Sequence, residues 1–254
     1  MKNRNVLSAS QKTVFCLALG LSAFFVIPSQ ALAMHIMEGY LPLEFCIAWG
    51  VVCVPFLVVG VMRLRKTVSE NRRSLILLAM AGAFIFVVSS LKIPSVTGSC
   101  SHMTGTGLSA ILFGVGTTSI LGIIVLVFQA ILLAHGGLTT LGANTFSMAI
   151  AGPALTWVLY KLMSRFKLNA RVCVFVAAAL GDLFTYCVTS LQLALAYPSE
   201  VGGVAASLVK FLSVFAPTQL PLAVVEGLLT VLIVMGMESF AAPELTSTAY
   251  REAN

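Results

Sequence analysis

Long apolar stretches separated by short polar loops run through most of this 254-residue chain. A helix of about 20 apolar residues is long enough to cross a bilayer, whereas a membrane β-barrel would show short segments of alternating polarity. The pattern therefore predicts an all-α integral membrane protein with about seven transmembrane helices in a single domain, residues 34–254. The predicted segments are 44–62, 74–91, 105–116, 118–134, 144–163, 170–195 and 216–237.

Residues 1–33 have the three parts of a secretory signal peptide. A basic start precedes an apolar run over residues 14–27, which is short for a membrane span. The segment ends in a proline followed by Ala-Leu-Ala, the small-residue pattern that signal peptidase cleaves. Cleavage would make Met34 and His35 the first two residues of the mature chain. The alternative is an uncleaved first transmembrane helix.

Composition and charge support a membrane protein and predict its orientation. Hydrophobic residues make up 59% of the chain and charged residues 9%, whereas a soluble domain carries about a quarter charged residues. The formal net charge is +6, with many of the basic residues in two loops, 63–73 and 161–171. Because positively charged loops stay in the cytoplasm, the mature amino terminus is predicted outside and the carboxyl terminus inside the plasma membrane. The charge thus reflects topology and not nucleic-acid binding.

All three histidines fall on the predicted outer side. A free amine on Met34, the amide nitrogen of His35 and its Nδ1 atom can close two chelate rings on Ni²⁺, Cu²⁺ or, less readily, Co²⁺, but not on Mg²⁺. His102, in a loop rich in Ser, Thr and Gly, is the best candidate for a fourth nitrogen ligand, and a loop histidine bonded to backbone is the alternative. His135 precedes two glycines, which is more typical of a helix end.

Other polar residues have supporting or competing roles in this prediction. Cys100 is a competing ligand because a thiolate suits Cu(I) or zinc. Hydroxyl groups near His102 can hydrogen-bond to the ligands, and Glu38 can do so or anchor the amino-terminal segment. Asp182 and Glu226 lie in apolar segments, where they either hold structure through polar contacts or line a translocation path. The further supporting residues are Ser99, Ser101, Thr104 and Asn144.

Several absences narrow the function. The chain contains no G-x-x-x-x-G-K-[ST] and no H-E-x-x-H motif, so it is predicted to be a transport subunit without its own ATPase rather than an enzyme. Uphill transport would then draw its energy from another subunit or from an ion gradient. A membrane haem or redox protein is the remote alternative, but its axial histidines usually lie within helices, unlike His35 and His102.

The mature chain resembles the substrate-binding membrane subunit, or S component, of energy-coupling-factor (ECF) importers for cobalt and nickel, the CbiM/NikM family. The resemblance extends over most of residues 34–240. The sequences of 95–108 and 128–148 are more similar to the cobalt branch of the family than to the nickel branch. The matching stretches are MHIMEGYLP (34–42), KIPSVTGSCSHMTGTGLSAILFG (92–114), FQAILLAHGGLTTLGANTFSMAIAGP (128–153), GDLFTYCVTSLQLALAYP (181–198) and QLPLAVVEG (219–227).

This resemblance implies a ligand set, a cargo and partners. The ligands are the Met34 amine, the amide nitrogen and imidazole of His35, and the imidazole of His102. The cargo is Co²⁺, usually for cobalamin synthesis, and Ni²⁺ is the alternative because four nitrogens suit it equally well. The partners are a transmembrane coupling (T) subunit, cytoplasmic ATPase (A) subunits and a small accessory membrane subunit.

Overall fold

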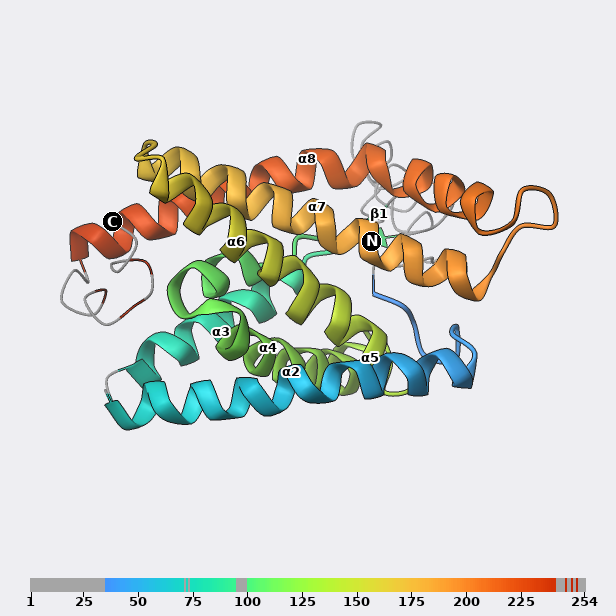
Figure 1. Cartoon of the computed structure of the whole chain (residues 1–254), viewed down its shortest axis with the longest axis horizontal. Coiled ribbons are helices and arrows are strands. Elements are labelled where there is room, and N and C mark those ends of the chain that lie inside the picture. The colour runs from blue at the N-terminus through green and yellow to red at the C-terminus, as the bar shows by residue number, and fades with distance from the viewer. Residues whose placement is uncertain are drawn as a thin grey trace, which may run out of the picture.

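The computed structural model is built almost entirely from helices (Figure 1). The structure describes residues 35–70, 72, 74–94 and 100–240, together with Leu245, Thr248 and Tyr250. The predicted leader, residues 1–33, and the predicted site residues Met34 and Ser99 lie outside these described residues. The predicted contribution of the amino terminus therefore stays a prediction.

The helices include the predicted apolar segments, but two of them are longer than predicted: α2 continues to Glu70, into the predicted loop 63–73, and α8 begins at Gly203, before the predicted start at residue 216. A π-helix, η2, continues α5 directly into α6, so that the three form one span of 25 residues. Two short strands, β1 and β2, pair antiparallel before α4. The elements are α2 (Leu43–Glu70), α3 (Ser74–Ser90), β1 (Ile93–Pro94), β2 (Cys100–Ser101), α4 (Thr106–Leu133), α5 (Leu141–Asn144), η2 (Thr145–Ala151), α6 (Gly152–Arg165), α7 (Ala170–Ala196) and α8 (Gly203–Phe240).

Within the described residues, five spans are long and apolar enough to cross a membrane: α2, α4, the α5–η2–α6 unit, α7 and α8. Helix α3 is also apolar but has only 17 residues. Large apolar side chains such as Met62 and Ile76 point outward, which suits a lipid environment and not water. These features agree with the predicted helical membrane fold, whereas the count of seven transmembrane helices stays a prediction.

The predicted segments 105–116 and 118–134 are joined in one helix, α4, which bends sharply at Gly114. Gly114 has φ 76° and ψ 173°, a conformation open almost only to glycine. Ser109 Oγ lies 2.9 Å from Thr118 Oγ1, whereas nine residues of a straight helix would rise by about 13.5 Å. The two arms of α4 therefore fold back toward each other, which explains why the apolar pattern contains two short segments here.

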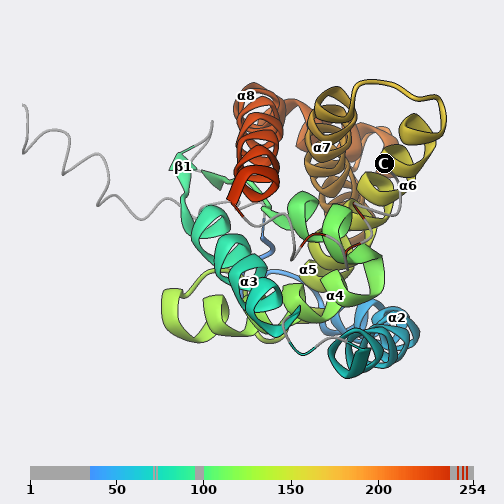
Figure 2. The same cartoon turned by 90° about the vertical axis from the view of Figure 1, so that its left-hand side faces the viewer.

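The two basic segments of the sequence, 63–73 and 161–171, include the ends of α2 and α6, which lie at the same end of the molecule. Figure 1 shows the α2–α3 and α6–α7 connections at the left, with the end of α8, and the α7–α8 connection at the right. Seen from that left-hand end, α7 and α8 lie side by side, with α2 at the opposite edge (Figure 2). One orientation in a bilayer thus places both basic segments in the cytoplasm, as the positive-inside rule requires. The orientation itself stays a prediction.

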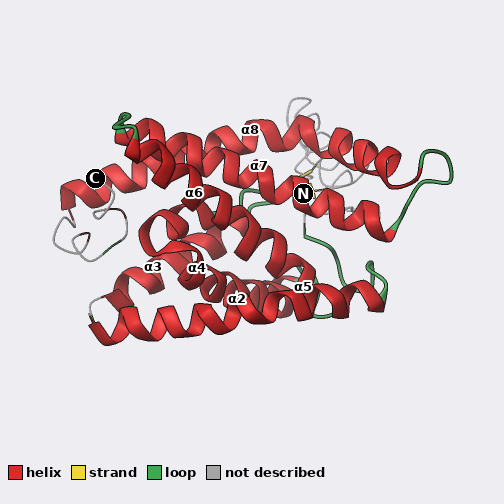
Figure 3. Cartoon of the chain, in the orientation of Figure 1, coloured by secondary structure: helices red, strands yellow, loops and turns green. Residues whose placement is uncertain are grey.

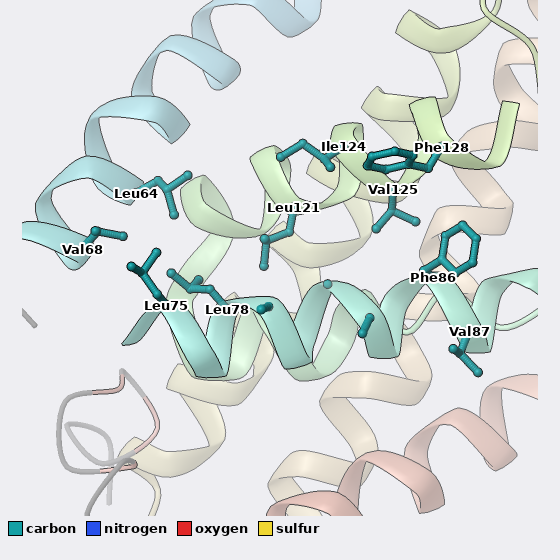
Figure 4. Close-up of a pocket in the computed structure, with 13 residues that line it drawn as sticks. Leu64, Val68, Leu75, Leu78, Phe86, Val87, Leu121, Ile124, Val125 and Phe128 are labelled. Carbon is teal, nitrogen blue, oxygen red and sulfur yellow. The ribbon is translucent and has the colours of Figure 1, made fainter. Parts of the chain in front are cut away.

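Helices cover nearly the whole of the described chain, and the loops are short (Figure 3). An apolar pocket of about 510 Å³ opens between α2, α3 and α4. Figure 4 shows Leu64 and Val68 of α2 on one side, Leu75 of α3 on another, and Leu121 and Phe128 of α4 behind them. Exposed apolar surface of this kind is expected where lipid surrounds a protein.

Helices α6 and α7 pack through a reciprocal pair of glycines and threonines. A Cβ atom on Gly152 of α6 would overlap Thr185 Oγ1, and one on Gly181 of α7 would overlap Thr156 Oγ1. Each glycine lies four residues before the threonine of its own helix, so both residues share one helical face. Small residues at such positions let two membrane helices approach closely without a large side chain between them.

Gly181→Ala is expected to lower the free energy of unfolding by about 1–3 kcal/mol, the usual cost of overpacking. The added methyl group must displace the Thr156 side chain or separate the helices. The melting temperature of the purified protein in detergent measures the effect. Gly236→Ala in α8 is the matched control, because a Cβ atom there meets nothing within 4 Å. Equal melting temperatures for the two variants would contradict the close helix approach.

Candidate metal centre

Three segments that are far apart in the sequence meet at one buried point. His35 belongs to the segment before α2, His102 to the loop between β2 and α4, and His135 to the turn after α4. The three residues are 2%, 0% and 1% exposed. Water is thus excluded from all three imidazoles, and each ring must find its hydrogen-bond partners within the protein or bind an ion.

The turn that carries His135 ends α4 abruptly. Ala134 has φ 46° and Gly136 has φ 80°, so the chain leaves the helical path on both sides of the histidine. The His135 N–H donates to the Gln129 carbonyl at 3.1 Å, which satisfies one of the free carbonyl groups at the helix end. The backbone of His135 therefore has the helix-ending role that the sequence predicts, while its side chain turns inward.

The three imidazole rings are in contact. His35 Nδ1 lies 2.9 Å from His135 Nε2, and the ring centroids of His35 and His102 are 4.4 Å apart. One possible ligand nitrogen from each ring lies within 4.8 Å of the other two, and this described cluster contains no carboxylate or thiolate. Metal–nitrogen bonds of about 2.0–2.1 Å place ligand nitrogens about 3–4 Å apart. A small inward movement would therefore complete a metal site.

Two ring nitrogens, His102 Nε2 and His135 Nδ1, have no hydrogen-bond partner among the described residues. The Met103 carbonyl accepts a hydrogen bond from His102 Nδ1 at 2.8 Å, which fixes the proton on that nitrogen. His102 Nε2 consequently carries a lone pair. A buried nitrogen lone pair beside two other imidazoles can bind a metal ion directly.

Burial keeps the three imidazoles uncharged. Desolvation lowers the pKa of His102 to about 4, although the hydrogen bond to the Met103 carbonyl opposes the shift. Burial is also the largest cause that lowers the pKa of His35 and of His135, and repulsion between the neighbouring rings adds to it. Because a metal ion binds neutral imidazole, the cluster is in its binding form at neutral pH and well below.

The segment that carries His35 is fixed by the α5 region. Ile36 N–H donates to Asn144 Oδ1 at 2.8 Å, and Asn144 Nδ2 donates back to the Ile36 carbonyl at 3.0 Å. Thr140 Oγ1 donates to the same carbonyl at 2.6 Å. Glu38 accepts two backbone N–H groups from the loop after His135. Hydrogen bonding from the Thr139 side chain, the largest cause, and from these N–H groups lowers the pKa of the Glu38 carboxyl. These contacts fix the backbone beside His35.

Asp182 and Glu226 hold the loop that carries His102. Thr104 donates its N–H to Glu226 Oε2 at 2.6 Å and its hydroxyl to Glu226 Oε1 at 2.8 Å. Asp182 accepts from the same Thr104 N–H at 3.2 Å and from Gln219 Nε2 at 2.6 Å. Gln219 Nε2 also donates to the His102 carbonyl at 3.3 Å. Both acids therefore anchor the His102 loop from the neighbouring helices α7 and α8.

The structure brings together most of the residues that the sequence pattern indicates. The three histidines form the cluster, and His135 takes a larger part in it than a helix-ending role implies. Ser101 Oγ is hydrogen-bonded to Thr218 Oγ1 at 2.7 Å and not to a histidine. The side chain of Cys100 lies outside the described part of the structure, so its role as a competing ligand stays a prediction.

Met148 is a further residue of the site, and the sequence pattern does not indicate it. Its Sδ atom lies 3.0 Å from His35 Nε2, and the residue is 1% exposed. It lies in the π-helix η2, a conformation that is frequent at functional sites. Met148 lies four residues after Asn144 and eight after Thr140, so all three residues share one helical face. This spacing is the only feature of the sequence that connects Met148 with the site. A methionine in an apolar segment otherwise indicates only packing.

A bundle of apolar helices around three buried imidazoles is typical of a membrane protein that binds a transition-metal ion. Comparison with known sequences gives the family. The family described as "Cobalt uptake substrate-specific transmembrane region" matches residues 35–244, and the chain therefore belongs to the CbiM family.

Curated relatives match almost the full chain. The cobalt transport protein CbiM of Lachnoclostridium phytofermentans is 63% identical over 239 residues, which cover 94% of this chain and 96% of the relative. The protein of the same name from Chlorobium limicola is 60% identical over 224 residues, 88% of each chain. That of Nostoc sp. is 52% identical over 245 residues, 95% of this chain and 93% of the relative. The similarity thus extends well beyond the histidine segments.

Two solved structures share the fold. A truncated transition metal transporter superimposes with a TM-score of 0.71 at 27% identity and covers 81% of this chain and 98% of its own. A transition metal transporter superimposes with a TM-score of 0.70 at 28% identity and covers 81% and 92%. Together with the five apolar spans of the described residues, these relatives indicate a multi-pass membrane protein of a metal-transport family.

Glu226→Gln is expected to loosen the His102 loop, because Thr104 uses both carboxylate oxygens and an amide has only one. A buried donor left unpaired costs about 1–3 kcal/mol. Hydrogen–deuterium exchange over residues 101–106 should become faster. Glu44→Gln, in the exposed first turn of α2, is the matched control and should leave that exchange unchanged. Equal exchange in both variants would show that Glu226 does not anchor the loop.

Proposed function

We propose that this chain is the substrate-specific membrane subunit of an ATP-driven ECF importer and that it captures Co²⁺ from the outer side of the membrane. The observation that carries the proposal is the buried cluster of three neutral histidines, in which the His102 Nε2 lone pair has no partner within the described residues. The name of the relatives, cobalt transport protein, supports Co²⁺ as the cargo. The ion is a substrate, so the site must release it as well as bind it.

In this proposal the mature amino terminus supplies most of the ligands. Cleavage after residue 33 frees the Met34 amine, which chelates the ion together with the His35 amide nitrogen and Nδ1. His102 Nε2 is the fourth ligand. The double hydrogen bond between Ile36 and Asn144 supports this arrangement, because it fixes the direction from which the chain reaches the cluster.

His135 offers an alternative ligand. Its Nε2 atom is 2.9 Å from His35 Nδ1, which is close to the separation of two neighbouring ligands on one metal ion. A set of three imidazoles, from His35, His102 and His135, is therefore the competing arrangement. The two ligand sets differ in whether binding releases protons, and this difference can be measured.

Neutral nitrogen ligands favour transition metals over Mg²⁺ and Ca²⁺, which prefer oxygen. Four nitrogens suit Ni²⁺ as well as Co²⁺, so nickel is the second candidate cargo. The two structural relatives are named only as transition metal transporters and do not decide between them. Uptake by the whole complex with both ions in competition distinguishes the two cargoes.

Transport in this proposal requires partner subunits. The chain has no P-loop motif, so ATP hydrolysis is assigned to cytoplasmic ATPase subunits. A transmembrane coupling subunit would transmit the movement, with a small accessory membrane subunit in the same complex. The complex would lie in the plasma membrane, with the histidine cluster toward the outer side and the imported cobalt supplying cobalamin synthesis.

Blocking the amino terminus is expected to abolish tight Co²⁺ binding, because a tag retained before Met34 turns the amine into an amide. The purified wild-type chain should begin at Met34 in mass spectrometry. Equilibrium dialysis should show that the tagged chain binds Co²⁺ more than about 100-fold more weakly. Removing a residue that only hydrogen-bonds to a metal ligand already lowers metal affinity about 10–100-fold, and the amine is itself a ligand.

His35→Ala and His102→Ala should lose as much affinity as the tagged chain, whereas His135→Ala should retain part of it. Full binding by the tagged chain, or complete loss in His135→Ala, would count against the amine chelate and favour the three imidazoles.

The pH dependence of Co²⁺ affinity separates the two ligand sets. The chelate displaces a proton from the amine, whose ordinary pKa is about 8, and one from the His35 amide. For each proton released, Co²⁺ affinity falls about tenfold when the pH falls by one unit. The chelate releases two protons, so its Co²⁺ affinity should fall about 100-fold per pH unit below pH 7.5. Three imidazoles release almost no protons between pH 7.5 and 5.5, because the pKa of His102 is about 4 and those of the other two are also lowered. A flat affinity over that range would exclude the chelate.

A further inference from the structure

Met148 is buried against the segment that carries His35. It is 1% exposed and packs in an apolar cluster with Ile85, Val125 and Leu126. Its Sδ atom lies 3.0 Å from His35 Nε2. A thioether can only accept a hydrogen bond, so this contact is favourable when His35 carries its proton on Nε2.

The proton positions of the other rings follow from that contact. With its proton on Nε2, His35 has a lone pair on Nδ1, which accepts a hydrogen bond from His135 Nε2 at 2.9 Å. His135 then keeps a lone pair on Nδ1, the atom that has no partner among the described residues. The opposite assignment would set a His35 lone pair against the sulfur and leave a buried His135 N–H without an acceptor. An orphaned N–H is the rarer and costlier defect.

We propose that Met148 is a positioning residue that fixes the tautomer of His35, so that Nδ1 offers its lone pair to the metal ion. This inference rests on the proposed function, in which His35 Nδ1 is a metal ligand. In the metal-free protein His135 occupies that lone pair as a hydrogen-bond donor. The arriving ion replaces His135 at the His35 Nδ1 lone pair. His135 is therefore buried in the cluster as a hydrogen-bond donor of the metal-free protein, and it is not a metal ligand.

A thioether is suited to a site that must release its ion. Imidazole ligands of resident metal sites usually donate to a carboxylate, a carbonyl or water, and a carboxylate makes the ligand more basic. Sulfur is a weak, uncharged acceptor. Met148 therefore orients the His35 ring without strengthening the metal–nitrogen bond as a carboxylate would.

The α5–η2 unit aligns Met148 with the other anchors of the same segment. Thr140, Asn144 and Met148 follow one another at intervals of four residues. The first two hydrogen-bond to the Ile36 backbone, and Met148 contacts the His35 ring. One helical face thus positions both the main chain and the imidazole of the proposed chelate.

Nitrogen-15 NMR of the metal-free protein labelled at histidine tests the inference, because the chain has only three histidines. The wild type should show His35 protonated at Nε2, with signals assigned from single His→Gln variants. Met148→Leu keeps the size and removes the acceptor, so His35 should shift toward the Nδ1–H tautomer. Met148→Gln supplies an amide oxygen and should restore the Nε2–H form. Met80→Leu, on the exposed face of α3, is the matched control.

Equilibrium dialysis supplies the second readout. Met148→Leu should weaken Co²⁺ binding about tenfold and Met148→Gln should recover most of it. A wild-type His35 protonated at Nδ1, or a tautomer unchanged in Met148→Leu, would overturn the inference. The wild-type spectrum decides even where the leucine variant fails to fold. Failure of the wild type to bind Co²⁺ would count against the proposed function, while the tautomer result would still decide the role of Met148.

Discussion

The candidate metal centre depends on one constraint, which is that three imidazoles share a buried volume from which water is excluded. A charged ring there would lose its hydration and repel its neighbours, so all three rings are neutral. Three neutral rings carry three N–H donors and three lone pairs. In the proposed tautomers the Met103 carbonyl, the Met148 sulfur and His35 Nδ1 accept the three N–H groups, so only one of the three lone pairs has a donor. Two lone pairs, on His102 Nε2 and His135 Nδ1, remain without partners among the described residues, and the first of these is the lone pair that the proposed chelate uses.

The acidic residues near the site hold its backbone and do not enter the cluster. Glu38 accepts N–H groups of the His135 loop, and Asp182 and Glu226 fix the His102 loop through Thr104. A carboxylate among the ligands would attract Mg²⁺ and Ca²⁺, which are far more abundant in most surroundings than cobalt. Keeping the carboxylates outside the cluster leaves three imidazoles, which suit a transition metal better than Mg²⁺ or Ca²⁺.

The sequence predicts the features whose signals are local. Apolar length gives the helices, and the two short apolar segments that are joined in α4 meet close to Gly114, which lies near the end of the first segment. His35 and His102 stand out because histidine is rare in this chain. The inward side chain of His135 depends on a left-handed turn at Ala134 that no local pattern predicts. The role of Met148 depends on a partner 113 residues away, and apolar residues carry no chemical signal of such a contact.

The two halves of the site are fixed to different groups of helices. The His35 segment is attached to the α5–η2 unit through Thr140, Asn144 and Met148. The His102 loop is attached to α7 through Asp182 and to α8 through Gln219 and Glu226. A metal ion bound between His35 and His102 would therefore bridge these two groups. Since metal–nitrogen bonds tolerate changes of only about 0.2 Å, a small shift of α7 and α8 relative to α5 would break one of them. Movement of helices within an importer could thus release the ion without any change in the ligands themselves.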